Sequence, residues 1–230
     1  MRYDFIEIGT SDFDTLVEQD WPEDVHGICV EPMEIYLNNL IRRPNVVYVT
    51  TAISDKDGEA TMYYPDPESF DVYNEINRDI RGCNTLHHVH PILRERTNAS
   101  GISDLAANAM AERLLAKMVK TRKVQTVTWE TFAITHDVTG IGHLKIAAEG
   151  HDIVILRQYF AHCEKHPECL ADKIEFETQR NVWGDLIDEA VAHLDKLHYV
   201  ALRPGRDRAT YVKEEPSYLK FGDFNLVVNN

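Results

Sequence analysis

The sequence predicts an α/β protein with a mostly parallel sheet, and three observations lead to this fold class. The chain has 230 residues, of which 43% are hydrophobic and 27% charged, and this is sufficient for one domain with a large core. Short apolar runs alternate with segments whose apolar residues recur at helical spacing, the pattern of strands joined by crossover helices. Several apolar runs end in glycine or acidic residues, at the strand ends where such sheets bind ligands.

The first half of the chain begins this alternation. Its predicted strands, read from short apolar runs, are residues 3–8, 26–30, 46–53 and 59–64. Its predicted helices, read from apolar residues that share one helical face, are residues 12–19 and 33–41. The turn at residues 55–58, Asp-Lys-Asp-Gly, separates the last two strands.

Residues 65–123 interrupt the alternation, and the second half of the chain resumes it. Within the interruption, residues 102–120 predict an amphipathic helix. The predicted strands of the second half are residues 124–128, 142–148, 173–178, 198–203 and 209–213, the last two as a closing hairpin. The predicted helices are residues 151–160 and 184–197. We therefore expect a single domain over residues 1–230 with an insertion at 65–123.

Charge and composition exclude several function classes. The net charge is −14, which disfavours nucleic-acid binding because that binding needs Lys and Arg to replace counterions. No window approaches the ~20 apolar residues of a membrane span, and the N-terminus lacks the apolar core of a secretion signal. Four cysteines without a CxxC pair favour a reducing compartment, so we expect a cytoplasmic protein without a membrane partner.

The acidic excess is uneven along the chain. Residues 65–123 hold nine basic and eight acidic side chains, whereas the remainder holds 15 basic and 30 acidic ones. The insertion therefore differs in kind from its flanks. A polar or mildly anionic ligand that docks on it and a solvated helical insertion are both consistent with this balance.

The first two strand ends carry candidate ligand-binding residues. Gly9 follows the first strand, where a residue without Cβ permits a sharp turn and close backbone approach to a ligand. The phosphate-binding G-x-G-x-x-G pattern is missing, which favours a ligand without phosphates over a dinucleotide. Glu31 ends the second strand, 22 residues later, where a carboxylate can accept two hydrogen bonds from a ribose diol. A plain strand-to-helix turn and a surface glutamate are the alternatives.

At this point the chain resembles the FkbM family of S-adenosylmethionine-dependent methyltransferases. The resemblance covers roughly residues 3–203 and rests on D-F-I-E-I-G-T, V-E-P, A-I-S-D-K-D-G and L-K-I-A-A-E-G-H-D-I-V-I-L. The segments Arg81-Gly82-Cys83-Asn84-Thr85 and His90-Pro91 also resemble one branch of the family. The resemblance implies a class I methyltransferase fold, a Rossmann-like, mostly parallel seven-stranded sheet with helices on both faces. It also implies S-adenosylmethionine as methyl donor and a hydroxyl of a sugar, glycan or small natural product as acceptor.

The resemblance assigns roles to the strand ends. Gly9 and its neighbours meet the methionine part of the donor, Glu31 holds the ribose, and residues 52–55 border the adenine. The implied donor-binding residues are Glu7, Gly9, Thr10, Ser11, Glu31, Pro32, Ala52, Ile53 and Ser54. A negative pocket suits the sulfonium cation of the donor. Lys145, inside a strand, is expected to be a structural charge partner.

The sequence departs from the family at Ala147, where the family usually has an aspartate. This removes a base or metal ligand beside the transferred methyl group, so a divalent metal is not favoured. We expect His151 to act as general base, with His90 and Glu149 as alternatives, because a hydroxyl is a weak nucleophile. Surface or capping roles for these side chains are the competing interpretation.

The insertion carries the candidate acceptor-binding residues, whose side chains can hydrogen-bond a polyol or a carboxylate. They are Arg81, Asn84, His87 and His88. We expect the insertion to act as a lid and acceptor site, or else to join copies of the chain through the apolar face of residues 102–120. The leading hypothesis is thus a hydroxyl methyltransferase. Its rivals are a catalytically silent donor-binding or scaffold protein, motivated by Ala147, and a nicotinamide-dependent oxidoreductase.

Overall fold

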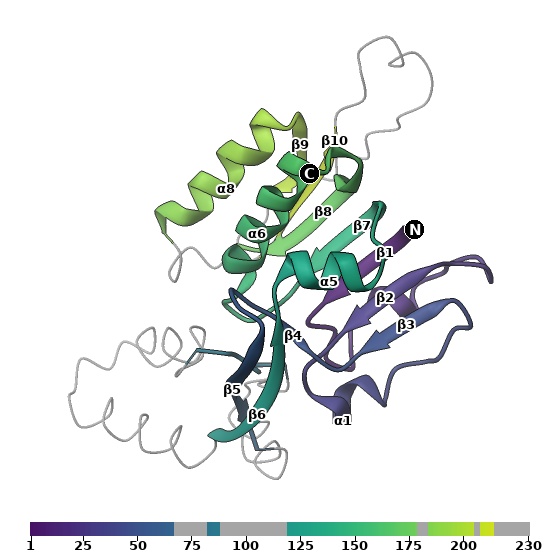
Figure 1. Ribbon diagram of the computed structural model, residues 1–230, viewed down its shortest axis with the longest axis vertical. Helices are drawn as coiled ribbons and strands as arrows, with labels where there is room; N and C mark the ends of the chain where they lie inside the picture. Colours follow the sequence, from purple (N-terminus) through teal and green to yellow (C-terminus); the bar gives the residue numbers. More distant parts are fainter. Residues whose placement is uncertain (67–81, 88–118, 179–183, 205–207, 214–230) are drawn as a thin grey trace, which may run out of the picture.

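A seven-stranded mixed sheet forms the centre of the molecule (Figure 1). The structure is a computed structural model that describes residues 1–66, 82–87, 119–178, 184–204 and 208–213. The strands in spatial order are β3 (Val46–Val49), β2 (Gly27–Val30), β1 (Arg2–Ile8), β7 (Gly140–Ile146), β8 (Ala171–Glu177), β10 (Arg208–Lys213) and β9 (Tyr199–Pro204). The prediction of a mostly parallel seven-stranded sheet is confirmed.

The direction of one strand departs from parallel. The neighbours from β3 to β8 pair in parallel, whereas β10 is antiparallel to both β8 and β9. The chain therefore places its last strand inside the sheet and leaves β9 at the edge. The predicted hairpin is confirmed, and its turn brings the start of β10 to the same end of the sheet as the carboxyl ends of the parallel strands.

A small second sheet stands beside the main one. It consists of β4 (Ala52–Ile53), β6 (Val119–Val127) and β5 (Gly58–Pro65), in that order. The prediction of one strand over 46–53 is wrong, because the chain leaves the main sheet after β3 and Thr51 Oγ1 donates to the carbonyl of Gln125. The prediction for 124–128 starts too late, since β6 begins at Val119 and pairs with the whole of β5. Residues 119–120 of the predicted helix 102–120 belong to β6, and residues 102–118 lie outside the described part of the chain.

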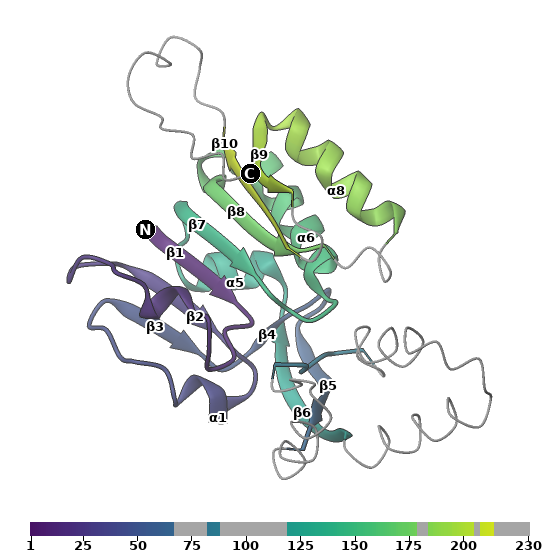
Figure 2. The same cartoon turned by 180° about the vertical axis from the view of Figure 1, so that it is seen from behind.

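Three helices cover one face of the main sheet (Figures 1 and 2). They are α5 (Trp129–Thr135), α6 (Asp152–Lys165) and α8 (Asp185–Lys196). Trp129 and Tyr159 are the largest fully buried side chains of this layer and pack against β-branched and aliphatic residues of the sheet. The helices predicted at 151–160 and 184–197 are confirmed. Helix α5 was not predicted from the sequence. Its N-cap is Thr128, whose side chain accepts a hydrogen bond from the amide of Thr131.

The opposite face, over β1 to β3, carries only short helical turns. The helix expected at 12–19 is wrong. In its place stands a single 3-10 turn, η1 (Leu16–Glu18), because Ser11 and Asp14 have φ angles of 48° and 53°, in the left-handed region. The helix expected at 33–41 is shorter in the structure, where α1 spans Glu34–Leu37. At its end, Arg42 Nη2 donates a hydrogen bond to the carbonyl of Leu37. In the described part of the chain, helices longer than one turn therefore cover one face of the sheet, whereas helices were expected on both faces.

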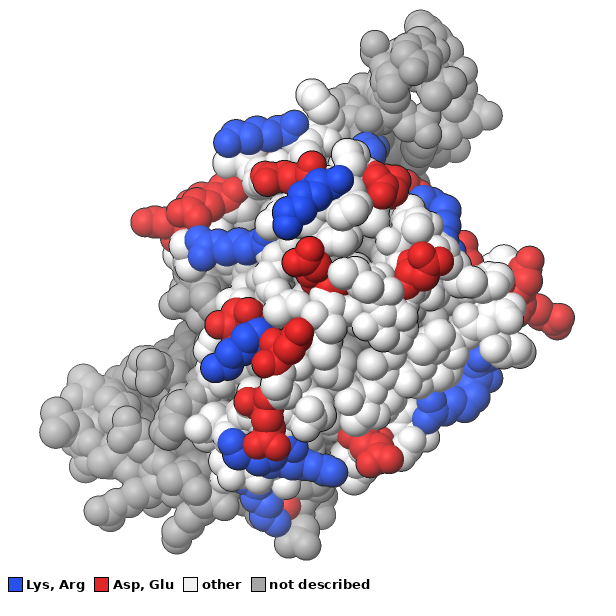
Figure 3. Space-filling model, viewed as in Figure 1, with Lys and Arg blue, Asp and Glu red and all other residues white. Residues whose placement is uncertain are grey.

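The outer surfaces of the helices are polar. Charged side chains of both signs are interspersed over the described residues of the face that carries α6 and α8 (Figure 3), and there Arg157 pairs with Glu189 at 2.7 Å. Among the described residues, no helix combines the length and the apolar character that crossing a bilayer requires.

Candidate functional site

A cavity lies at the carboxyl ends of β1, β2, β7 and β8, beside the small sheet. The space between its lining side chains totals about 750 Å³, part of which is open solvent. Ten residues singled out by sequence line it: Gly9, Thr10, Ser11, Glu31, Pro32, Ala52, Ile53, Asn84, Glu149 and His151. The fold therefore brings into one cavity most of the described residues that the sequence analysis selected from separate strand ends.

Gly9 makes this convergence sterically feasible. Its φ angle is 79°, and a Cβ built on it would stand 2.2 Å from the carbonyl oxygen of Ala147. The end of β1 and the end of β7 are therefore in direct backbone contact, which no residue with a side chain permits. The glycine that the sequence analysis read as a ligand-binding turn has this packing role as well.

Glu31 is buried at the cavity wall and connects the first two strand ends. Its Oε2 accepts from the amide of Ser11 at 2.9 Å, and its Oε1 accepts from the amide of Met33 at 2.8 Å. Burial raises the pKa of this carboxyl to about 7, while the two amide hydrogen bonds oppose the rise. Each oxygen retains one lone pair, so the carboxylate can still accept two further hydrogen bonds from a ligand.

Glu7 does not line the cavity. It is fully buried, and its carboxylate contacts Lys145 Nζ at 2.9 Å and accepts from the amide of Leu16 at 2.7 Å. Burial raises the pKa of Glu7, and the charge of Lys145 opposes that rise. The two residues stand opposite each other in the pairing of β1 with β7. The expectation that Lys145 is a structural charge partner is confirmed, and the ammonium group also donates to the carbonyl of Asp14.

His151 begins α6 and lines the cavity with only 8% of its surface exposed. Its Nε2 lies 3.1 Å from Ser54 Oγ, and its ring centroid lies 5.4 Å from that of His87. Burial and, to a smaller extent, the nearby His87 lower the pKa of His151 to about 4, so the imidazole is neutral at physiological pH. Ser54 is thus placed beneath His151 and outside the cavity wall.

Part of the insertion closes one side of the cavity. Gly82, Asn84 and Leu86 line it, and Thr85 exchanges two backbone hydrogen bonds with Tyr63 of β5. A Cβ on Gly82 would stand 2.7 Å from the ring of Phe13, so the insertion meets the β1 loop across the cavity. The candidate residues Arg81, His88 and His90 lie outside the described residues.

The sequence analysis missed a charged part of the cavity wall. Asp14, Glu177 and Arg208 line it, and Arg208 Nη1 lies 3.0 Å from Asp14 Oδ2. Arg208 starts the antiparallel strand β10, so only the sheet order reveals that it reaches the carboxyl edge. With Glu31 and Glu149, the lining holds four acidic side chains against two basic ones, which makes it net acidic.

Three buried polar atoms of the cavity wall have no hydrogen-bond partner among the described residues. They are Ser11 Oγ, Asn84 Oδ1 and His151 Nδ1. Buried polar groups are normally paired, and leaving one unpaired costs about 1–3 kcal/mol. All three belong to side chains that line the cavity. In the described part of the chain, no group of three or more His, Cys, Asp or Glu side chains is arranged to hold a metal ion.

Comparisons of this chain with protein-family models, curated proteins and solved structures give no match. The assignment of the site therefore depends on its own geometry and chemistry.

Proposed function

We propose that this chain is an S-adenosylmethionine-dependent methyltransferase that transfers the methyl group to a hydroxyl of a sugar, glycan or small natural product. The observation that carries the proposal is the cavity, in which the Gly9–Ser11 turn, Glu31 and the Ala52–Ile53 strand converge at the carboxyl edge of the sheet. These are the elements to which the FkbM resemblance assigns the methionine, ribose and adenine of the donor.

The strand order supports the same class. Dinucleotide-binding sheets have the order 3-2-1-4-5-6, counted along the main sheet. The present sheet shares its first five positions, but its last strand enters antiparallel between the two strands before it. The resemblance implies a mostly parallel seven-stranded sheet for the class I methyltransferase fold, and this sheet has that composition. Together with the single glycine of the first turn, the antiparallel last strand disfavours the nicotinamide-dependent oxidoreductase.

The cavity wall fits the donor in charge and hydrogen bonding. Glu31 offers two free lone pairs to the ribose hydroxyls, and Ser11 Oγ offers an unpaired hydroxyl to the methionine part. Ala52 and Ile53 present an apolar surface to the adenine. The net acidic lining stabilises the sulfonium cation. The methyl group is delivered from this sulfonium by in-line displacement at carbon.

On the acceptor side, His151, Asn84 and Glu149 surround the remaining space. An acceptor hydroxyl that donates to the imidazole stands where its oxygen can approach the methyl carbon to about 3–3.5 Å. The oxygen forms a bond to that carbon, the carbon–sulfur bond breaks towards sulfur, and the imidazole takes the hydroxyl proton. The insertion, through residues 82–87, acts as the wall that holds the acceptor.

Ala147 gives a specific reason to retain one rival function. It lines the cavity with a methyl group where the family places a carboxylate. Glu149, whose φ angle is 47°, and Glu177 are acidic side chains in the same wall. A chain that binds the donor without turning it over, a silent donor-binding or scaffold protein, is therefore the second candidate.

Calorimetric titration with S-adenosylmethionine and, separately, with NAD⁺ tests the proposal. We expect saturable binding of the first ligand and no binding of the second. Production of S-adenosylhomocysteine with a panel of polyhydroxylated acceptors then separates the enzyme from the silent protein. Failure to bind S-adenosylmethionine, or equal binding of both ligands, would contradict the proposal.

Donor binding is expected to weaken as the pH falls below about 7. The pKa of Glu31 is raised to about 7, and the ribose hydrogen bonds favour its ionised form, so binding releases a proton at lower pH. The affinity should approach a tenfold loss per pH unit in the acid limit, and His151, with a pKa of about 4, does not add to it between pH 5 and 8. The measurement is calorimetry at pH 5.5, 6.5 and 7.5.

Glu31→Gln is the matched control for this pH dependence, because it cannot ionise and the ligand's own titration affects both proteins equally. The slope of log Kd against pH should be smaller in Glu31→Gln than in the wild type. Identical slopes would show that Glu31 is not the titrating group.

A further inference from the structure

Polar contacts of His151 with Ser54 and Asp55, outside the cavity wall, bear on which ring nitrogen of His151 carries the proton. Ser54 Oγ lies 3.1 Å from His151 Nε2 and donates its hydroxyl proton to Asp55 Oδ1 at 3.3 Å. A serine hydroxyl has one proton and two lone pairs. When this proton is directed to the carboxylate, which can only accept, the Ser54 oxygen accepts from the imidazole. In that arrangement Nε2 carries the ring proton.

The other ring nitrogen is consequently an acceptor. His151 Nδ1 has no hydrogen-bond partner among the described residues and belongs to a side chain that lines the cavity. His151 is also the N-cap of α6, a helix of 14 residues, whose amino end carries partial positive charge. That charge favours a lone pair over an N–H on a ring beside it. The place of the ring at the helix start thus favours the neutral imidazole over the imidazolium.

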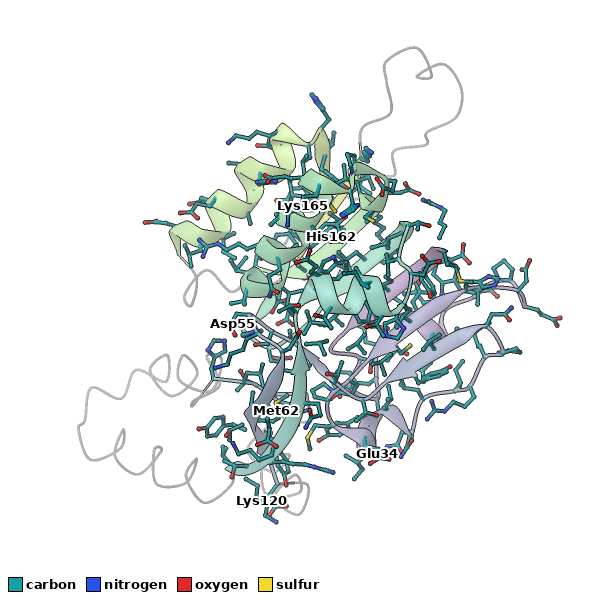
Figure 4. All side chains as sticks on the ribbon, viewed as in Figure 1. Glu34, Asp55, Met62, Lys120, His162 and Lys165 are labelled. Atoms are coloured by element: carbon teal, nitrogen blue, oxygen red, sulfur yellow. The ribbon has the colours of Figure 1, made fainter. Side chains whose placement is uncertain are left out.

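The hydroxyl of Ser54 is held firmly in place. The amide of Ser54 donates to the carbonyl of Val127 at 2.9 Å, and its carbonyl accepts from Gln158 Nε2 at 2.8 Å. Gln158 lies on α6, two turns beyond His151, and its Oε1 accepts from the amide of Trp129. Asp55 is exposed at the turn between β4 and β5, on the side of the small sheet nearest α6, whereas Met62 lies farther along β5 (Figure 4). The small sheet and the helix layer therefore fix the serine together.

We propose that Ser54 and Asp55 are positioning residues, which hold the His151 imidazole in the Nε2–H tautomer with the Nδ1 lone pair facing the cavity. When Nδ1 takes the proton of an acceptor hydroxyl, the ring becomes an imidazolium. Its Nε2–H remains bonded to Ser54, which remains bonded to the Asp55 carboxylate, and no proton leaves the pair. This orientation of a base by a third group follows the logic of a catalytic triad. The role in catalysis rests on the proposed function, but the tautomer does not.

The tautomer can be measured without donor or acceptor. In protein labelled with ¹⁵N-histidine, long-range ¹H–¹⁵N correlation spectra distinguish the Nε2–H ring from the Nδ1–H ring, and the spectrum of His151→Gln identifies the signals of His151. We expect Nε2–H in the wild type, and a shift towards Nδ1–H or a mixture in Ser54→Ala and Asp55→Asn. Asp20→Asn, at an exposed aspartate in the connection from β1 to β2, is the control and should match the wild type.

The outcomes separate this inference from the proposed function. An Nδ1–H ring in the wild type overturns the inference, as does an unchanged tautomer in both Ser54→Ala and Asp55→Asn. If Ser54→Ala does not fold, Asp55→Asn and the wild type still decide. Absence of donor binding in the wild type contradicts the proposed function and leaves the tautomer result standing.

Once an acceptor is known, kinetics provide a second readout. Ser54→Ala should lower kcat by about 100-fold, the lower end of what a positioned general base contributes, with the KM for the donor unchanged. Ser54→Thr keeps the hydroxyl and should restore most of the rate. A loss of kcat in Ser54→Thr equal to that in Ser54→Ala would mean that the hydroxyl has no positioning role.

Discussion

Glu31→Ala is expected to weaken the binding of S-adenosylmethionine by at least about 100-fold. The carboxylate supplies two acceptors for the ribose diol, and each hydrogen bond to a charged group contributes about 1.5–3 kcal/mol. Its removal also leaves the amides of Ser11 and Met33 without their acceptor, which loosens the turn that meets the methionine. Calorimetry on folded variants, with folding checked by circular dichroism, provides the measurement.

Glu34→Ala is the matched control for this loss. Glu34 is an exposed acid at the start of α1, close in the sequence to Glu31 and remote from Asp55 in Figure 4. Its removal changes the net charge by the same amount and should leave donor affinity within twofold. Comparable affinity in Glu31→Ala and wild type would refute the assignment of the ribose to Glu31.

Lys145→Met is expected to lower the free energy of unfolding by about 3–5 kcal/mol, the cost of breaking a buried ion pair by removing one partner. It leaves the Glu7 carboxylate fully buried without its cation, and also releases the carbonyl of Asp14. The double variant Glu7→Gln with Lys145→Met removes the stranded charge and should recover part of the loss. Urea unfolding measures these differences.

The loss in Lys145→Met should depend on pH in a defined direction. Burial already raises the pKa of Glu7, and removal of the lysine raises it further. An acid whose pKa is higher in the folded state contributes stability that is present below its unfolded pKa and lost as the pH rises. The deficit should therefore be larger at pH 8 than at pH 5. Lys173→Met, at a half-exposed lysine 3.9 Å from Glu175, is the control and should cost less than about 1 kcal/mol. A similar small cost for Lys145→Met would contradict the buried-pair argument.

The central strands were predictable because each is a short, mostly apolar run buried in the sheet. Residues 3–8 and 26–30 match β1 and β2 to within a residue or so, since most buried side chains of a central parallel strand are apolar. The absence of the helix expected at 12–19 could not be predicted, because contacts with other elements override the helical spacing of its apolar residues. The amide of Leu16 donates to the Glu7 carboxylate, and the amide of Ser11 donates to the Glu31 carboxylate. These amides therefore do not form helical hydrogen bonds.

The candidate site shows the same division. Gly9, Glu31 and His151 could be selected from the sequence, because glycine, acid and histidine at strand ends have chemical uses that their neighbours lack. Arg208 and Glu177 could not be placed beside them, since they reach the cavity only through the antiparallel insertion of β10 next to β8. Ser54 was assigned to the donor from its position after a strand, whereas the structure places its hydroxyl against His151.

By itself, the sequence determined that this protein has an α/β fold with a parallel sheet and that its chemically useful residues stand at strand ends. Hydrophobic periodicity and residue type are local properties, and they suffice for those conclusions. Only the tertiary structure decided that the chain leaves the main sheet after β3, that Glu7 is paired with Lys145, and that Ser54 lies against His151. Those features depend on contacts between residues far apart in the chain, such as Ser54 and His151, and such contacts exist only after folding.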